Sequence, residues 1–306
     1  MAIRKVISPY YQFVKKMVIR LIIRGQRISG AYSNDVFTIY RDYVLNQIKS
    51  HSVGKSPFYH MFIDEILPQK LYDEIFQLMV NQKYGGNLQE RIQDNKEFVN
   101  KRFGLSDTTN VAVVYLKNIF LDHQVKLALF KKFYIIPSNE FISLIDIHEK
   151  EFEFVFCSPH RFQNIHVDIP PKYMSLVFYF PEAELTEEQE KDNATILYDK
   201  NLEPNLKANF RRNSVCVFSP HFYSYHGFSS TMQRDVIVMF YLNKNEKSTW
   251  NKDIANDESF KQATYKKLIT YPLIEYGKDY EKIQLEMKNC LVNRPMGRVV
   301  KNDQES

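Results

Sequence analysis

Two histidines and one aspartate lie in apolar segments of this chain at spacings that suit a metal ion. His166 and Asp168 are two positions apart in a run that should form a strand, so their side chains project from the same face. His226 lies in a second strand-like run and supplies a third ligand if that strand is a neighbour. Two imidazoles and one carboxylate on one face of an ion leave about three coordination positions open, as in non-haem Fe(II) sites.

Arg234 adds a second kind of chemistry close to this set. The His-x-Asp spacing is weak by itself, because chance supplies about 0.4 such triplets in a chain of this composition. Arg234 follows His226 by eight residues and opens another apolar run. Its planar guanidinium could bind a carboxylate through two hydrogen bonds, and the alternative for Arg234 is a surface ion pair. His221 is the alternative to His226, with a spacing to Arg234 that fits less well.

The elements that must position these residues are short apolar runs separated by turn signals. Such a series predicts a β-sandwich or barrel of the jelly-roll kind. Helical periodicity precedes and follows it, so we expect an α+β fold with a mainly β core and flanking N-terminal and C-terminal helices. Strands are expected at residues 57–63, 141–147, 151–157, 174–180, 195–199, 214–218 and 235–242, and helices at 34–49, 68–80, 117–133, 257–269 and 273–291. Residues 85–107 predict a loop or weak helix, and the charged residues 186–192 predict a solvated loop rather than a lid.

The segment HVDIPPKYMSLVFYF, which begins at His166, resembles the Fe(II)/2-oxoglutarate-dependent dioxygenase superfamily, and most closely its prolyl-hydroxylase-like branch. In that branch a His-x-Asp strand is followed by a strand that Lys-x-x-Ser leads. The resemblance covers about residues 57–242 and implies a double-stranded β-helix, or jelly-roll. It also implies that His166, Asp168 and His226 bind iron and that Arg234 binds the distal carboxylate of 2-oxoglutarate. Asn193-Ala194 stands where relatives often carry glycines.

The activity that this resemblance implies is oxidation of a C–H bond with Fe(II), 2-oxoglutarate and O₂, releasing succinate and CO₂. Asp168 favours hydroxylation, because halogenating relatives lack the carboxylate ligand. The substrate is left open between a peptidyl or free amino acid and another small molecule. The alternative function is a cupin-like metal-binding barrel that acts as a sugar isomerase or as a non-redox ligand-binding module, and a third reading is an inactive barrel on a membrane-associated scaffold. Neither alternative requires Arg234.

Several further residues are candidates for contacts with substrate or co-substrate. Tyr179 and Tyr198 lie on expected strands beside the metal set and could donate hydroxyl groups to 2-oxoglutarate. Arg161 and Asn164, just ahead of His166, could anchor a polar substrate. Aromatic residues crowd the approach to His226 and could form a substrate wall, although packing in the core is the commoner role for such residues. They are Phe222, Tyr223 and Tyr225.

Composition excludes some function classes. The 3 cysteines show no Cys-x-x-Cys spacing, which argues against a zinc ribbon or disulfide framework and favours a reducing, cytoplasmic compartment. With 9 glycines in 306 residues, the chain carries no Walker-type or dinucleotide-binding pattern.

The positive charge is concentrated at the N-terminus. Residues 1–30 hold seven basic residues and no acid, which leaves 34 basic and 36 acidic residues in the rest of the chain. Helical spacing there predicts a basic amphipathic helix that packs on the domain or lies on an anionic membrane, or a transit peptide. Nucleic-acid binding and a transmembrane span are not expected. We divide the chain into a basic extension (1–55), a dioxygenase domain (56–245) and a C-terminal helical segment (246–306), and the oligomeric state is left open.

Overall fold

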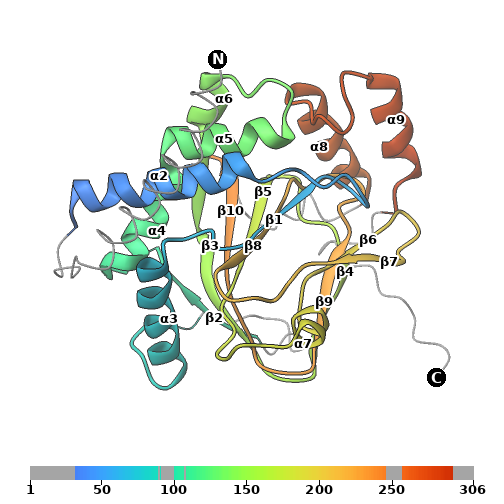
Figure 1. Ribbon diagram of the computed structural model, residues 1–306. Helices are drawn as coiled ribbons and strands as arrows, with labels where there is room; N and C mark the ends of the chain where they lie inside the picture. The colour runs from blue at the N-terminus through green and yellow to red at the C-terminus, as the bar shows by residue number, and fades with distance from the viewer. Residues whose placement is uncertain (1–31, 89, 91–99, 107, 246–256, 292–306) are drawn as a thin grey trace, which may run out of the picture.

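The strands assemble into two antiparallel sheets (Figure 1). This computed structural model describes residues 32–88, 90, 100–106, 108–245 and 257–291. The larger sheet has the order β1 (His60–Ile63), β8 (Ser214–Phe218), β5 (Lys172–Tyr179), β10 (Arg234–Asn243), β3 (Ile145–Cys157) and β2 (Asn100–Gly104). The smaller sheet has the order β4 (Arg161–His166), β9 (His226–Ser230), β6 (Ile196–Tyr198) and β7 (Pro204–Lys207).

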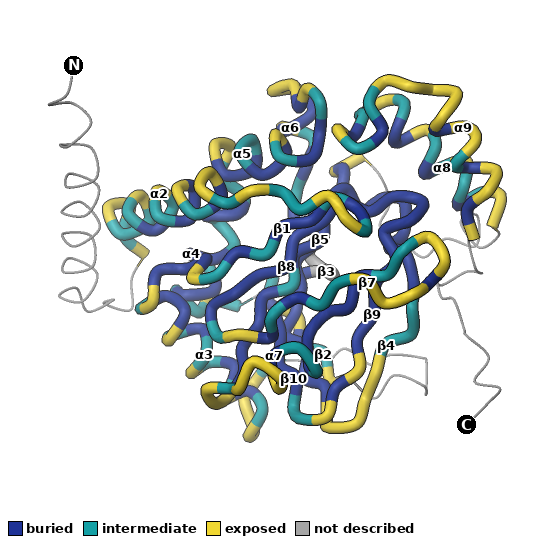
Figure 2. The backbone as a smooth tube through the Cα atoms, turned by 45° about the vertical axis from the view of Figure 1, so that its right-hand side comes forward, coloured by how far each residue is buried: buried dark blue, intermediate teal, exposed yellow. Residues whose placement is uncertain are grey.

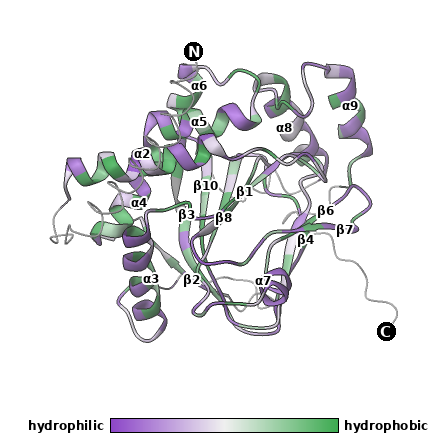
Figure 3. Cartoon of the chain, viewed as in Figure 1, coloured by the Kyte–Doolittle hydropathy of each residue, from purple (hydrophilic) through white to green (hydrophobic). Residues whose placement is uncertain are grey.

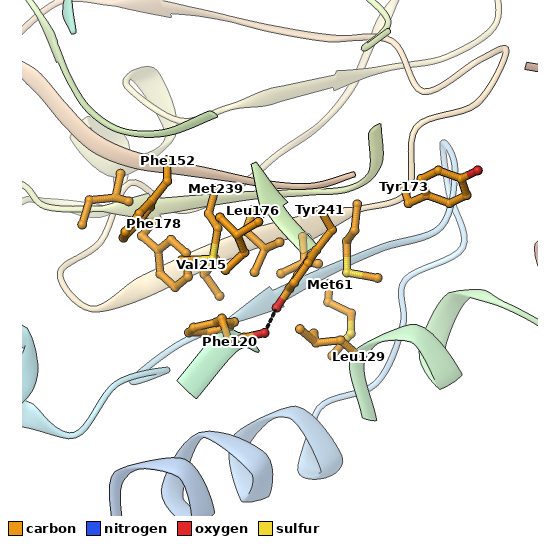
Figure 4. Packing of buried hydrophobic residues seen from close by; sticks show 14 of the residues in the cluster. Met61, Phe120, Leu129, Phe152, Tyr173, Leu176, Phe178, Val215, Met239 and Tyr241 are labelled. Carbon is orange, nitrogen blue, oxygen red and sulfur yellow. Dashed lines mark hydrogen bonds between the residues drawn. The ribbon is translucent and has the colours of Figure 1, made fainter. Parts of the chain in front are cut away.

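Side-chain alternation gives the larger sheet two different faces. On β5, Leu176 and Phe178 point to the outer face, whereas Tyr179 points to the inner face. The outer face packs against helices and forms the main hydrophobic cluster, in which Phe120 of α4 and Leu129 of α5 lie beneath the strands (Figure 4). The inner face carries a second, smaller cluster with residues of the smaller sheet, which include Leu197. We call the space within this second cluster the interior.

The helices cover the outer face and the ends of the sheets. Figure 2 shows the central strands as buried and the outer turns of the helices as exposed, and Figure 3 shows hydrophobic and hydrophilic residues alternating around the helices. Each fully buried Leu or Phe stabilises such packing by about 1.5–3 kcal/mol. The helices are α2 (Asn34–Ser50), α3 (Gln69–Lys83), α4 (Val111–Leu121), α5 (His123–Phe133), α6 (Asn139–Leu144), α7 (Glu187–Asp192), α8 (Asp257–Thr270) and α9 (Tyr280–Asn289).

Several expected elements differ in the structure. The single helix expected at 117–133 is two helices, because Asp122 adopts ψ 135° and caps α5. The expected strand at 141–147 is mostly the short helix α6, which Ser138 caps by accepting a hydrogen bond from the Phe141 N–H at 3.0 Å. The helix expected at 273–291 is confined to α9, because Gly277 has φ 66° and Asp279 caps a new start.

Three polar stretches also form elements that were not expected from the sequence. Residues 85–107 contain the strand β2, and β7 was not expected at all. Residues 186–192 form α7 with a capping box between Thr186 and Gln189, instead of a solvated loop. Residues 1–30, which carry the basic residues of the extension, lie outside the described residues, so their helical character and their membrane contact stay predictions, as does the division into three domains.

All three cysteines are free and buried. Within the described ranges no helix is both long enough and apolar enough to span a membrane.

The break between α4 and α5 gives a stability prediction. The Asp122 carboxylate accepts hydrogen bonds from the N–H groups of Gln124 at 2.9 Å and Val125 at 3.3 Å. We expect Asp122→Ala to lower the free energy of unfolding by about 1 kcal/mol, measured by urea denaturation, because it leaves these donors without their cap. The control Asp42→Ala removes only an exposed ion pair with Arg41 and should change stability by less than about 0.5 kcal/mol. Equal losses in the two variants would contradict the capping role.

Candidate metal centre

The pairing of β4 with β9 brings the two histidines together. His166 ends β4 and His226 begins β9, and the two residues are direct partners in the antiparallel register. Asp168 lies two residues beyond the end of β4, in the turn that leads to β5. The expectation that His166 and Asp168 share one strand is therefore wrong, because His166 is the last residue of β4 and Asp168 lies outside it. The turn nevertheless returns the Asp168 carboxylate to the imidazoles.

The ligand atoms of His166, Asp168 and His226 lie within 4.8 Å of one another. The two imidazole rings have centroids 4.1 Å apart, and each of the three residues is only 8% exposed. Each Nδ1 donates to a backbone carbonyl at 2.9 Å, from His166 to Asn164 and from His226 to Ser224. These bonds place the proton on Nδ1 and leave Nε2 of each ring as the acceptor that can bind a metal ion. In the structure His166 Nε2 accepts a hydrogen bond from the Gln163 side-chain amide at 3.2 Å, which a bound metal ion would displace.

The protonation states of the three residues suit metal ligands. Burial lowers the pKa of His166 to about 3, with a further contribution from His226, and burial also lowers the pKa of His226. Burial alone would raise the pKa of Asp168, but Lys172 and the two histidines hold that pKa below its usual value. Near neutral pH the cluster therefore presents two neutral imidazoles and one carboxylate. This donor set fits a divalent ion such as Fe(II).

Two residues that hold Asp168 were not identified as functional from the sequence. Lys172 Nζ donates to Asp168 Oδ1 at 2.8 Å, and Ser175 Oγ donates to Asp168 Oδ2 at 2.6 Å. Both belong to the Lys-x-x-Ser sequence that opens β5. Their spacing of four and seven residues from Asp168 was visible in the sequence. It served there only to support a resemblance, and it could have suggested that both residues contact the carboxylate.

Arg234 is buried in the interior, where neutral groups accept its hydrogen bonds. Arg234 is only 3% exposed, which excludes the surface ion pair that was the alternative role for this residue. Nε donates to the Asn193 carbonyl at 3.0 Å and Nη2 donates to Thr195 Oγ1 at 3.1 Å. Among the residues that the structure describes, no Asp or Glu forms an ion pair with this guanidinium. Burial lowers the pKa of Arg234. The charge is therefore only partly satisfied by neutral acceptors.

The guanidinium lies close to the metal cluster along β9. The Arg234 Cζ atom is 4.0 Å from the centroid of the Phe228 ring. Phe228 is two residues after His226 on β9, so both side chains project from the same face of the strand, about 7 Å apart along it. Arg234 and the three candidate ligands thus face the same interior.

Asn193 explains the departure from glycine in the loop before β6. Its side-chain oxygen accepts hydrogen bonds from Ser230 Oγ at 3.0 Å and from the Thr231 and Met232 N–H groups at 2.9 and 3.1 Å. These bonds fix the hairpin between β9 and β10. The Asn193 backbone carbonyl is then oriented toward Arg234, so the side chain has a structural function that glycine could not provide.

The two tyrosine candidates lie on different faces. Tyr179 lies in the interior, where its hydroxyl donates to Thr195 Oγ1 at 2.7 Å and its ring centroid is 5.6 Å from Arg234 Cζ. Leu197 points into the interior, whereas its neighbour Tyr198 packs against the outer cluster. The structure therefore brings Tyr179 to Arg234 and does not bring Tyr198 there. Thr195, which contacts both Arg234 and Tyr179, was not identified from the sequence.

The candidate substrate residues are placed in two regions. Arg161 is exposed at the start of β4, and Asn164 is half-buried and uses its carbonyl to orient His166. The aromatic residues are buried beneath the C-terminal helices: the Tyr223 hydroxyl donates to Glu286 of α9 and the Tyr225 hydroxyl donates to the Leu291 carbonyl. Phe222 is 0% exposed. The substrate roles of these five residues stay predictions.

His221, the alternative third ligand, lies outside the metal cluster. Its Nδ1 is 2.9 Å from the Tyr276 hydroxyl and its Nε2 is 3.2 Å from Glu275 Oε2. The structure groups His226, and not His221, with His166 and Asp168.

Comparisons with known proteins give structural neighbours only. No protein-family model matches the sequence, and no curated protein matches it. A prolyl hydroxylase from Trichoplax adhaerens, in complex with a hypoxia inducible factor oxygen degradation domain peptide fragment, is 13% identical with a TM-score of 0.46, over 67% of this chain and 89% of that chain. A prolyl-4-hydroxylase from Pseudomonas putida is 12% identical with a TM-score of 0.47, over 66% and 98%. The epimerase SnoN, in complex with Fe3+, alpha ketoglutarate and nogalamycin RO, is 6% identical with a TM-score of 0.41, over 66% and 83%.

Two of these neighbours are prolyl hydroxylases, and the third is an epimerase that holds Fe3+ and alpha ketoglutarate. In this chain the His166–Asp168–His226 cluster could hold a metal ion. Identities of 6% to 13% are too low to establish a shared substrate or reaction.

Gly227 provides a test of the cluster's geometry. A Cβ atom at this position would lie 2.7 Å from the Gln163 carbonyl oxygen of β4, which is too close for any side chain. We expect Gly227→Ala to push β9 away from β4, to separate the imidazoles and to weaken Mn(II) binding at least about tenfold, measured by calorimetry, with a loss of about 1–3 kcal/mol in stability. The control Gly104→Ala has open space around its Cβ and should bind Mn(II) normally. Unchanged Mn(II) affinity in Gly227→Ala would show that this close approach does not set the site.

Proposed function

We propose that this chain is an Fe(II)- and 2-oxoglutarate-dependent dioxygenase that hydroxylates its substrate. One observation carries the proposal: a buried His-Asp-His cluster faces the same interior as a buried arginine that has no carboxylate partner among the described residues. The cluster supplies three ligands for Fe(II). The arginine supplies the charge that a dicarboxylic co-substrate needs at its far end.

The arrangement of strands supports a double-stranded β-helix. Along the chain, β3, β5, β8 and β10 belong to the larger sheet, whereas β4, β6, β7 and β9 belong to the smaller sheet. The chain thus crosses repeatedly between two antiparallel sheets, as it does in a jelly-roll. We infer that β1 and β2 extend the larger sheet of this barrel.

The metal ion would be held by His166, Asp168 and His226 from one side. Bound Fe(II) would supply the oxygen chemistry, for which the protein provides position, charge and exclusion of water. The Nδ1–H bonds to Asn164 and Ser224 orient the imidazoles, and Lys172 and Ser175 hold the carboxylate. The presence of Asp168 as a third ligand favours hydroxylation over halogenation.

Arg234 would bind the distal carboxylate of 2-oxoglutarate. Its present acceptors are a carbonyl and a hydroxyl, so a carboxylate would provide the negative charge that this buried cation lacks. Tyr179 lies beside it and orients Thr195, which can turn its own hydroxyl toward the same carboxylate. A cupin-like isomerase has no comparable need for a buried guanidinium here.

The substrate class stays a proposal at the level of a peptide or a small molecule. The Trichoplax adhaerens neighbour was solved with a peptide fragment, and SnoN was solved with nogalamycin RO. Arg161, exposed on β4, is the candidate for contact with a polar substrate.

The test is co-substrate turnover. With Fe(II) and ascorbate, we expect the protein to convert 2-oxoglutarate to succinate slowly even without its substrate, measured by succinate formation and O₂ uptake. Arg234→Met should raise the KM for 2-oxoglutarate about a hundredfold, because removing one partner of a buried charge pair costs about 2–5 kcal/mol of binding. The control Arg212→Met alters an arginine that stacks on Phe76 and should leave this KM unchanged. Mn(II) binding without succinate formation would favour the cupin-like alternative.

A further inference from the structure

Both oxygens of Asp168 are already engaged by protein groups. Lys172 Nζ lies 2.8 Å from Oδ1, Ser175 Oγ lies 2.6 Å from Oδ2, and His226 Nε2 lies 3.8 Å from Oδ2. The oxygen on the imidazole side is thus Oδ2, whereas Oδ1 is held by an ammonium group. A metal ion between the imidazoles and Asp168 would meet a carboxylate whose charge Lys172 has partly neutralised.

The Lys172 ammonium is held firmly in this position. The side chain is 8% exposed, and Nζ lies 3.4 Å from the centroid of the Phe240 ring. The Lys172 backbone N–H donates to the Ile169 carbonyl at 3.0 Å, which closes the turn between Asp168 and β5. Moving the Lys172 ammonium away would leave the buried Asp168 carboxylate uncompensated, which would cost free energy.

The charges of the interior are therefore unbalanced toward the positive side. Asp168 contributes one negative charge, and Lys172 and Arg234 each contribute one positive charge. Arg102 and Glu153 form a separate pair of opposite charges at 2.7 Å. These five side chains of the interior sum to one positive charge. A divalent cation raises this to three, and a dianion returns it to one. Charges of the same sign repel strongly in such a buried site.

We propose that Lys172 is a positioning residue that makes binding of the divalent ion depend on a bound dianion. It restricts Asp168 to ligation through one oxygen, and its positive charge opposes a metal ion that arrives alone. A dicarboxylate that contacts the metal at one end and Arg234 at the other removes this opposition. The inference rests on the proposed function and concerns the coupling between the two ligands of that site.

The experiment separates the charge of Lys172 from its hydrogen bond. Mn(II) binding to the full-length, metal-free protein is measured anaerobically from the EPR signal of free Mn(II), with and without saturating 2-oxoglutarate. Lys172→Gln keeps a donor for Asp168 and removes the charge, whereas Lys172→Arg keeps the charge. The matched control is Lys126→Met, which removes another buried lysine, one that donates to the Ile142 and Ile145 carbonyls.

For the wild type, Lys172→Arg and Lys126→Met, we expect 2-oxoglutarate to tighten Mn(II) binding about tenfold or more. Lys172→Gln should bind Mn(II) alone about tenfold more tightly than the wild type and gain less than about threefold from 2-oxoglutarate. Lys172→Met should behave in the same way and serves if Lys172→Gln lacks the native circular dichroism spectrum.

Two results would overturn the inference in distinguishable ways. If the neutral variants keep the wild-type affinity and the wild-type gain from 2-oxoglutarate, Lys172 has only a structural role, and the proposed function still stands. If the wild type binds no Mn(II) with or without 2-oxoglutarate, the proposed function itself is wrong.

Discussion

The structure depends on the close antiparallel pairing of β4 and β9. This pairing sets His166 directly opposite His226, and Gly227 permits the approach because its position leaves no room for a Cβ atom against the Gln163 carbonyl. Without hydrogen bonds, the two rings could rotate and each could adopt either tautomer. Here each ring donates through Nδ1 to a carbonyl two residues before it in the chain. The backbone thus fixes both the separation of the two imidazoles and the direction of their Nε2 lone pairs.

The polar groups of the interior form a second constraint. The surrounding cluster is apolar, with Val155, Phe218 and Val238 among its members, so any charge there loses its hydration. Replacing a buried ion pair with apolar residues of similar volume is often neutral or stabilising. The Asp168–Lys172 pair and the buried Arg234 are therefore not explained by a contribution to folding stability. Their retention in an otherwise apolar space is best explained by ligands that carry charge of both signs.

The sequence predicted that His166, Asp168 and His226 would meet, but it did not predict all the elements around them. His166, His226 and Arg234 could be assigned to strands because apolar strand patterns are short-range. The helix break at Asp122 was missed because the apolar periodicity continues across it, and only the capping geometry of one side chain interrupts the helix. The contacts of Lys172 with Asp168 depend on a turn whose path no periodicity describes. Strand register, the path of a turn and the burial of a charge depend on the tertiary fold, so the sequence pattern alone could not predict them.

The C-terminal helices form hydrogen bonds to the segments that carry the candidate metal ligands. Lys267 of α8 donates to the Lys172 carbonyl at 2.9 Å and to the Pro220 carbonyl at 2.7 Å. These carbonyls belong to the two segments that carry the candidate ligands: one follows Asp168 and the other precedes His226. In the buried segment between β8 and β9, the Tyr223 hydroxyl donates to the Glu286 carbonyl of α9 and the Tyr225 hydroxyl donates to the Leu291 carbonyl just beyond α9. His221 lies against Tyr276. Residues 257–291 therefore contribute to the geometry of the metal cluster, because they fix the two segments whose separation determines it.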